Sequence, residues 1–248
     1  RAGRIDAALR YLEQARSIAQ SEKDSILEAR ANLQLGAVYG VQGKYDRAKT
    51  FLERALKAFE NQNDHQGLVD VYTNLGASAA SAKKDQAALA CHLKALTAAR
   101  KLKDDNKIAR CLLNTAFAYA TAAQWKKAVN SHRDSLEIAR RLQDRRLEAF
   151  NLYGIAGIVI DRDQRSTEIT KAITFLDEAI AILTECGDRS ILCDCLFKRA
   201  QAKCMARQDY RKDIGKAFDI AKQMGISWLE EAILSWKNQH NEGNPCRF

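Results

Sequence analysis

The chain has 248 residues, of which 46% are hydrophobic and one is proline. Proline breaks helix interiors, so its scarcity is compatible with an almost entirely helical protein. No apolar run approaches the roughly 18 residues needed to cross a bilayer, and no signal-peptide pattern begins the sequence. Lysine and arginine outnumber aspartate and glutamate by 40 to 31, which gives a net charge of +9. This positive charge is compatible with an acidic partner.

Residues 1–20 are predicted to form one helix. The segment from Gly3 to Ala8 aligns with the segment from Gly43 to Ala48, 40 positions later. The first segment therefore corresponds to the turn and second helix of a hairpin whose first helix lies outside the sequence. We expect the chain to be a piece of a longer protein. We also expect this helix to expose an apolar face made of Ile5, Leu9, Leu12 and Ile18.

Residues 25–225 are expected to form about five helical hairpins, because small residues recur at a fixed period. One series at intervals of 40 consists of Gly36, Gly76, Ala116 and Ala156. A second series, on the following predicted helix, consists of Ala48, Ala88 and Ala128. Small side chains let two helix backbones approach closely. A fixed period of this kind indicates an array in which each unit buries its apolar face against its neighbours.

The end of the array departs from the regular period. Ala128 and Ala172 are 44 positions apart, and the extra residues fall in the polar segment 161–168. Residues 226–240 are predicted to be a final helix that caps the stack, with Trp228, Ala232 and Trp236 on one face. A partner-binding tryptophan ridge is the alternative for that face. Residues 241–248 are expected to be a loose tail.

The individual hairpins carry a recognisable pattern. The first helix of one hairpin has Leu35, Gly36 and Tyr39, and the second has Ala48, Leu52 and Ala55. This pattern resembles the tetratricopeptide repeat. The period of 40 and the absence of the proline that usually ends the second helix resemble the long-repeat Partner of Inscuteable-type adaptors. The resemblance implies an all-α protein, a right-handed α-solenoid of tetratricopeptide-like helical hairpins.

The first helices of such an array are expected to line a concave groove, where residues one period apart form rows. Carboxamides form one row: Gln34, Asn74 and Asn114. Four residues earlier, a second row consists of Arg30, Asp70 and Arg110. A carboxamide offers both a donor and an acceptor, so it can pair with the backbone of an extended peptide. Arginine can bind a carboxylate through two hydrogen bonds.

In the adaptors that the chain resembles, concave asparagine and arginine hold an extended partner segment. This implies a peptide-binding site made of Arg30, Gln34, Asn74, Arg110 and Asn114. Phe117 and Tyr153 extend the site toward apolar side chains of the partner. Asp70 argues against a uniformly acidic ligand. An alternative remains open, in which the side chains of Asn74 and Asn114 bond to backbone groups or face water without binding a partner. The fifth hairpin has Lys198 and Arg199 at the corresponding positions. We expect it to contribute least to the peptide-binding site.

We therefore expect a non-enzymatic scaffold that binds an extended, partly acidic segment of a partner protein in its groove. Residues 100–146 offer an alternative, because they hold twelve basic and five acidic residues. That basic patch is compatible with a nucleic-acid-associated or regulatory array. The protein partner is favoured because no aromatic stacking platform is interleaved with the basic cluster. A groove filled by the chain's own flanking segments is a further alternative.

Catalysis and the binding of a metal or cofactor have no positive support in the sequence. No phosphate loop, nucleophile motif or CxxC spacing occurs, so we expect no catalytic residue, no metal and no cofactor. A zinc site of Cys186, Cys193 and Cys204 is the remote alternative. His92 and His132 stand where Leu52 and Leu176 stand in other units, and are expected to be packed core residues. The seven cysteines contain no CxxC spacing, which is typical of a reducing compartment. We expect a cytoplasmic protein without membrane insertion, with the nucleus as the alternative.

Overall fold

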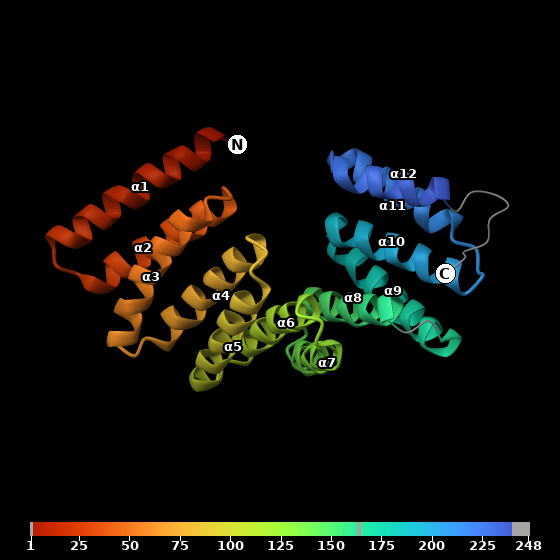
Figure 1. Cartoon of the computed structure of the whole chain (residues 1–248), viewed down its shortest axis with the longest axis horizontal. Helices are drawn as coiled ribbons and strands as arrows, with labels where there is room; N and C mark the ends of the chain where they lie inside the picture. The colour runs from red at the N-terminus through yellow and green to blue at the C-terminus, as the bar shows by residue number, and fades with distance from the viewer. Residues whose placement is uncertain (1, 163–164, 240–248) are drawn as a thin grey trace. The chain divides into compact units, whose positions relative to one another are not determined.

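The computed structural model describes residues 2–162 and 165–239, and each regular element within these ranges is an α-helix (Figure 1). The first is α1 (Ala2–Ser21). It is followed by the pairs α2 (Ser25–Val41) and α3 (Tyr45–Asn61), α4 (His65–Ser81) and α5 (Asp85–Leu102), α6 (Asp105–Thr121) and α7 (Trp125–Arg141), α8 (Arg145–Arg162) and α9 (Ser166–Cys186), and α10 (Arg189–Met205) and α11 (Arg211–Met224). The last is α12 (Ser227–Gln239). The expected all-α solenoid of helical hairpins is confirmed. The expected tail, residues 241–248, lies outside the described residues.

The helices belong to two compact units, Arg1–Ala128 and Val129–Phe248, which are called unit 1 and unit 2 below. In unit 1, α2 packs against α3 and α4 packs against α5, and α4 also contacts α2 and α6 directly. In unit 2, α8 contacts α10 in the same way. The first helices of each unit thus lie side by side. We call the exposed side of α2, α4 and α6 the inner face of unit 1. The exposed side of α8 and α10 is the inner face of unit 2.

The two helices of a hairpin approach closely at the predicted small residues. A Cβ atom added to Gly36 would lie 2.5 Å from Cγ of Leu52 and 3.1 Å from the carbonyl oxygen of Ala48. Leu52 and Ala48 are themselves fully buried. One period later, a Cβ atom on Gly76 would lie 2.6 Å from Cε1 of His92. Glycine is therefore required at both positions, because a larger residue would push the two helices apart.

Aspartate begins each first helix from α2 to α10. The side chain of Asp24 accepts hydrogen bonds from the backbone N–H groups of Ile26 and Leu27, 3.0 and 2.9 Å away. The equivalent caps are Asp64, Asp104, Asp144 and Asp188. These caps satisfy N–H groups that have no partner within the helix. The second helices α3 and α5 begin after Lys44 and Lys84, which make no side-chain cap.

The turns follow a shorter period than the hairpins. Residues with positive φ angles occur at intervals of 20 from position 23 to position 143: Lys23, Gly43, Asn63, Lys83, Lys103, Ala123 and Gln143. Each lies in the left-handed region and reverses the chain after a helix. The turn within a hairpin therefore has the same backbone form as the turn between hairpins. Most of these positions hold residues other than glycine and carry some backbone strain.

The last helix, α12, packs through a different face from the one expected. Leu229 and Ile233 are buried, and the Trp236 ring packs edge-to-face with Tyr210, with centroids 5.2 Å apart. Trp228, by contrast, is 67% exposed. The expectation that Trp228 and Trp236 share one environment is wrong. Eight helical positions leave them about 80° apart around the helix axis, whereas Leu229, Ile233 and Trp236 stay within about 60°.

The expected apolar face of α1 is exposed only in part. Ile18 is 58% exposed, as expected. Ile5, Leu9 and Leu12 are half-buried instead, because α1 packs against α2. Tyr11, which the sequence did not single out, is 72% exposed.

We predict that Gly36→Ala destabilises unit 1 by about 1–3 kcal/mol, because its methyl group would overlap the Leu52 side chain. Gly157→Ala is the matched control, since nothing lies within 4 Å of the added Cβ atom. The control should be neutral or stabilising by about 0.5–1 kcal/mol, the ordinary gain from removing a helical glycine. Urea denaturation of both variants measures the difference. Equal responses would contradict the close helix approach at Gly36.

We predict that Ala123→Gly stabilises the protein by about 0.5–1 kcal/mol, because it relieves a residue held at a φ of 57°. The reverse change, Gly43→Ala, should destabilise by a similar amount. At Gly43 the nearest atom to an added Cβ is the Tyr45 hydroxyl at 3.9 Å, so the effect would come from the backbone alone. Thermal unfolding of the two variants checks the pair. Shifts of the melting temperature in the same direction would refute the strain argument.

Candidate functional site

The carboxamide row lies on the inner face of unit 1. Gln34 is exposed, and Asn74 and Asn114 are half-buried. Within the described part of the chain, the side chains of Gln34 and Asn114 make no hydrogen bond. Asn74 differs, because its Nδ2 atom donates to the backbone carbonyl of Asp70 over 2.8 Å. Two complete carboxamides and the Oδ1 acceptor of Asn74 are therefore available to a ligand.

Helix geometry explains why these side chains point outward. Gln34, Asn74 and Asn114 each precede by two positions a small residue of the hairpin contact. Two residues correspond to about 200° of rotation around an α-helix. The side that contacts the second helix and the side that carries the carboxamide are therefore opposite. The close hairpin contact at Gly36 and Gly76 and the exposed carboxamide row are two consequences of one periodic pattern.

The charged row on the same face alternates in sign. Arg30 and Arg110 are exposed on α2 and α6, and Asp70 is half-buried on α4 between them in sequence order. The Oδ2 atom of Asp70 accepts a hydrogen bond of 2.9 Å from Nε2 of Gln66. The inner face of unit 1 thus presents positive charge at two repeats and negative charge at the repeat between them. A ligand of mixed charge suits it better than a uniformly acidic one.

Two aromatic residues complete the predicted site. Phe117 on α6 is 39% exposed, three residues after Asn114. Tyr153 lies in unit 2, on α8, where it packs against the hydrophobic core that includes Leu152 and Ile155. Burial raises the pKa of the Tyr153 hydroxyl, and the charge of Asp194 raises it further. The six other predicted residues all belong to unit 1, so the structure brings those six onto one face and assigns Tyr153 to the other unit.

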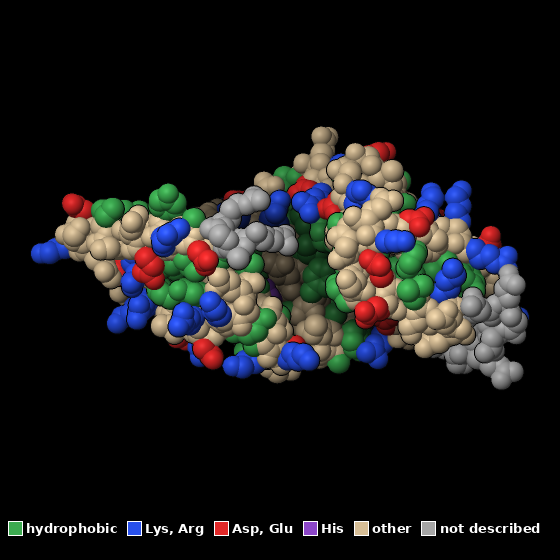
Figure 2. Space-filling model, turned by 90° about the horizontal axis from the view of Figure 1, so that it is seen from above, with side chains coloured by type: hydrophobic (Ala, Val, Ile, Leu, Met, Phe, Trp, Pro, Cys, Tyr) green, Lys and Arg blue, Asp and Glu red, His purple; other side chains and the backbone are tan. Residues whose placement is uncertain are grey.

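Three of the seven arginines in the basic patch, residues 100–146, form ion pairs with acidic side chains. Nε of Arg140 binds Glu148 and its Nη2 binds Glu178, both at 2.7 Å. Arg145 also binds Glu148, and Arg146 binds Asp188, both again at 2.7 Å. On the face shown in Figure 2, basic side chains are interspersed with acidic and apolar ones. This arrangement provides fewer unpaired charges for phosphate groups than the sequence suggested.

The two histidines are buried between helices, as expected. His92 is 7% exposed and His132 is 1% exposed, and burial lowers the pKa of both rings. Nδ1 of His132 donates to Oδ1 of Asn151 over 3.1 Å, and Nδ2 of Asn151 donates to Ser135 over 2.8 Å. These are packing interactions of neutral rings. His92 thus takes the structural place that Leu52 holds in the first complete hairpin, since it lies against Gly76 as Leu52 lies against Gly36, whereas His132 lies against Gly154 of α8.

Sequence reasoning missed a hollow of about 350 Å³ in unit 1. It is lined by residues from α4 and α5: His65, Leu68, Tyr72, Leu93, Lys94, Thr97, Ala98 and Lys101. Nζ of Lys94 lies 5.4 Å from the centroid of the Tyr72 ring, and the Tyr72 hydroxyl donates to Glu60 over 3.0 Å. The residues that line the hollow come from two helices and do not recur at a fixed spacing in the sequence, so no periodic pattern predicts the hollow.

Residues 2–162 and 165–239 contain neither a metal-binding cluster nor a membrane-spanning helix. No group of three or more histidine, cysteine or acidic side chains in these ranges could hold a metal ion. We also find among them no helix whose length and hydrophobicity would let it span a bilayer.

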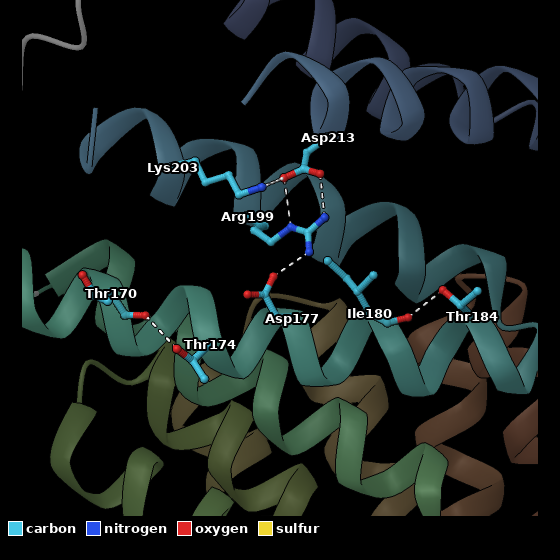
Figure 3. A network of polar contacts seen from close by, with 8 residues as sticks. All are labelled: Thr170, Thr174, Asp177, Ile180, Thr184, Arg199, Lys203 and Asp213. Carbon is cyan, nitrogen blue, oxygen red and sulfur yellow. Dashed lines mark hydrogen bonds and ion pairs between the residues drawn. The ribbon is translucent and has the colours of Figure 1, made fainter. Parts of the chain in front are cut away.

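Charged side chains join the two helices of the fifth hairpin, α10 and α11, to each other and to α9 (Figure 3). Nε and Nη2 of Arg199 bind the two carboxylate oxygens of Asp213, at 2.9 and 2.6 Å. Lys203 binds the same carboxylate at 2.9 Å, and Nη1 of Arg199 binds Asp177 at 2.6 Å. Burial by itself raises the pKa of Asp213, but the hydrogen bonds from Arg199 and Lys203 outweigh burial and lower it. Arg199 is therefore a structural residue that joins α9, α10 and α11.

Comparison with known proteins gives a family match. A family model described as "Tetratricopeptide repeat" matches residues 1–61 and 67–141, which is more than half of the chain. The search of curated proteins finds no significant match.

Several solved structures share the fold at low sequence identity. BtubC from P. vanneervenii is 18% identical with a TM-score of 0.70, and the match covers 98% of this chain and 94% of that one. The apo quorum sensor NprR from B. thuringiensis is 16% identical with a TM-score of 0.73, over 94% of this chain and 66% of NprR. A STAND protein with a tetratricopeptide repeat sensor, from Pyrococcus horikoshii, is 17% identical with a TM-score of 0.67, over 86% and 34%. This chain thus spans about a third of the STAND protein.

We predict that Asp213→Asn destabilises unit 2 by about 3 kcal/mol at neutral pH, because Arg199 and Lys203 would lose a buried charged partner. The folded state lowers the pKa of Asp213, so its contribution is complete above the ordinary aspartate pKa of about 4. It is lost as the pH falls through the folded value. The difference in the free energy of unfolding between wild type and variant should therefore become smaller below about pH 4. Urea titrations at pH 7 and pH 3 measure it, with exposed Asp219→Asn on the same helix as control. A gap that is constant with pH would contradict the role of this carboxylate.

Proposed function

This chain belongs to the tetratricopeptide repeat family, and we propose that it is a non-enzymatic module that binds an extended segment of a partner protein. The proposed binding surface is the inner face of unit 1. Its residues are Arg30, Gln34, Asn74, Arg110, Asn114 and Phe117. The partner is expected to be of mixed charge, because Asp70 separates the two arginines.

One observation carries the proposal. Gln34 and Asn114 hold equivalent places two repeats apart, and the side chain of neither is engaged within the described residues. A carboxamide can donate to a peptide carbonyl and accept from a peptide N–H at once. Carboxamides repeated along a face can therefore follow a peptide backbone whatever its side chains are. The solved complex of NprR with its cognate peptide NprX shares this fold, with 17% identity and a TM-score of 0.66.

The nucleic-acid alternative is weaker. Binding to phosphates depends on lysine and arginine side chains that are free to displace counterions. Arg140, Arg145 and Arg146, in the densest part of the basic segment, are each paired with a carboxylate. A partner rich in phosphate would have to break these pairs before it gained from the same arginines.

A random 12-residue peptide library displayed on phage supplies probes for the test. Peptides selected on the wild-type chain are titrated by calorimetry against the double variant Gln34→Ala, Asn114→Ala. We expect affinity to fall about 5- to 150-fold, since each lost hydrogen bond is worth about 0.5–1.5 kcal/mol. Arg110→Glu should weaken peptides that carry a carboxylate further, because it reverses an attractive charge.

The matched control is the double variant Gln86→Ala, Asn130→Ala. Both residues are exposed carboxamides, on the second helices α5 and α7. The control should bind with wild-type affinity. If the control loses binding while the Gln34→Ala, Asn114→Ala variant retains it, the second helices bind the peptide and the proposal is wrong.

A further inference from the structure

The hollow beside Tyr72 and Lys94 opens on the opposite side of α4 from the carboxamide row. Tyr72 precedes Asn74 by two positions, which correspond to about 200° of rotation around the helix. His65 and Leu68, which also line the hollow, precede Tyr72 by seven and four positions and therefore share its side of α4. The lining residues all belong to α4 and α5, so the hollow lies within unit 1. A ligand bound there leaves the carboxamides free.

Apolar side chains make up part of the lining. Leu68 and Tyr72 contribute from α4, and Leu93 and Ala98 contribute from α5. Leu93 is 37% exposed, so a considerable part of an apolar side chain meets water at this place. A ligand group that covers this surface is stabilised, because apolar surface is removed from water. This part of the lining favours a ligand with an apolar body.

Two lysines supply positive charge to the same hollow. Lys94 and Lys101 lie seven positions apart on α5, nearly two helical turns, and therefore share one side of the helix. Nζ of Lys94 lies 5.4 Å from the centroid of the Tyr72 ring, and this contact leaves its N–H groups able to donate. Within the described part of the chain, neither lysine pairs with a carboxylate. None of the lining residues, all of them described, is acidic.

An acidic side chain does contact one lining residue, but it is already engaged. Oε1 of Glu60, on α3, accepts a hydrogen bond of 3.0 Å from the Tyr72 hydroxyl. Among the described residues, Glu60 forms no ion pair with either lysine. The charge of the two lysines is therefore uncompensated in the folded chain, whereas three arginines of the basic patch are paired with acids.

The size and the charge of the hollow define its ligand. Its volume of about 350 Å³ is at the lower end of the roughly 300–1,000 Å³ that is typical of small-molecule sites. Lysine offers a point charge with three donors, so it binds a carboxylate without a fixed geometry. An inorganic anion would gain only ion pairs of exposed lysines, which contribute little by themselves. An uncharged ligand would gain nothing from the two ammonium groups. A small molecule with both an apolar body and a carboxylate uses the whole lining.

We propose that this hollow binds a small organic anion that carries a carboxylate. Its apolar body packs against Leu68, Leu93 and the Tyr72 ring. Lys94 and Lys101 bind its carboxylate. This inference goes beyond the proposed function, because the ligand is a small molecule instead of a protein segment and binds on the opposite side of α4.

Ligand-observed NMR titrations of the full chain test the site with cinnamate, a flat aromatic carboxylate, and with cinnamamide, its neutral analogue. Cinnamate should saturate wild type with a Kd on the order of 1 mM, which is the range expected for so small a ligand. Cinnamamide should bind roughly fivefold more weakly, since it loses the attraction to the two lysines. The double variant Lys94→Gln, Lys101→Gln should bind the two compounds alike. Thr97→Trp should abolish binding of both, because its ring would fill the hollow.

The matched control is the double variant Lys57→Gln, Lys126→Gln, which removes the same charge at exposed positions of α3 and α7. It should keep the preference for cinnamate, and circular dichroism melts establish that each variant is folded. A wild type that shows no saturable cinnamate binding, or that binds both compounds equally, overturns the proposal. A preference that survives in Lys94→Gln, Lys101→Gln, or that the control loses as well, overturns it too.

The outcomes separate this inference from the proposed function. The Gln34→Ala, Asn114→Ala variant should bind cinnamate with wild-type affinity, because both changes lie on the inner face. If library peptides depend on Gln34 and Asn114 while cinnamate does not bind, the inference fails alone. If cinnamate binds as expected while the peptides do not depend on Gln34 and Asn114, the proposed function fails alone.

Discussion

The close approach of the two helices in the hairpins α2–α3 and α4–α5 is the constraint on which the rest of unit 1 depends. At Gly36 the Leu52 side chain lies across the backbone of the first helix, and at Gly76 the His92 ring does the same. This contact fixes which side of the first helix is buried. Because residues two positions apart point in nearly opposite directions, it also fixes which side is free. The carboxamide row is the direct consequence, so the packing of the array and its candidate binding surface are determined together.

Charge pairing decides which of the many polar side chains remain available. Arg140, Arg146 and Arg199 are engaged in ion pairs with residues of neighbouring elements, and Arg145 pairs with Glu148 within α8. The pair between Arg199 and Asp213 is buried and costly to break, so Arg199 serves the fold. Arg140, Arg145 and Arg146 are about half exposed or more, and ion pairs of exposed side chains contribute little to stability. In contrast, Gln34, Asn114 and Lys101 have no partner in the described residues. Function is expected where the fold leaves such groups unpaired.

The sequence predicted the features that depend on residue identity at a fixed spacing. The helical hairpins, the small residues at the hairpin contact and the buried histidines all belong to this class. The turns at intervals of 20 were missed, because the left-handed position is occupied by residues as different as Lys83, Ala123 and Gln143. The aspartate caps recur at a regular spacing in the sequence, but they were not among the predicted features.

The features that spacing did not predict depend on the contacts of individual side chains. Trp228 is exposed because α12 turns Leu229 and Ile233 toward the core. Asn74 donates its amide group to its own helix, which spacing cannot reveal. Such facts require the positions of side chains from several helices at once.

The central claim is that carboxamides on the first helices follow the backbone of an extended segment. A crystal structure of the chain with a library-selected peptide tests this most directly. The account predicts peptide backbone N–H and C=O groups within hydrogen-bond distance of the side chains of Gln34 and Asn114, about 2.7–3.2 Å. A peptide seated instead in the hollow beside Tyr72 and Lys94, or along the second helices, would contradict it.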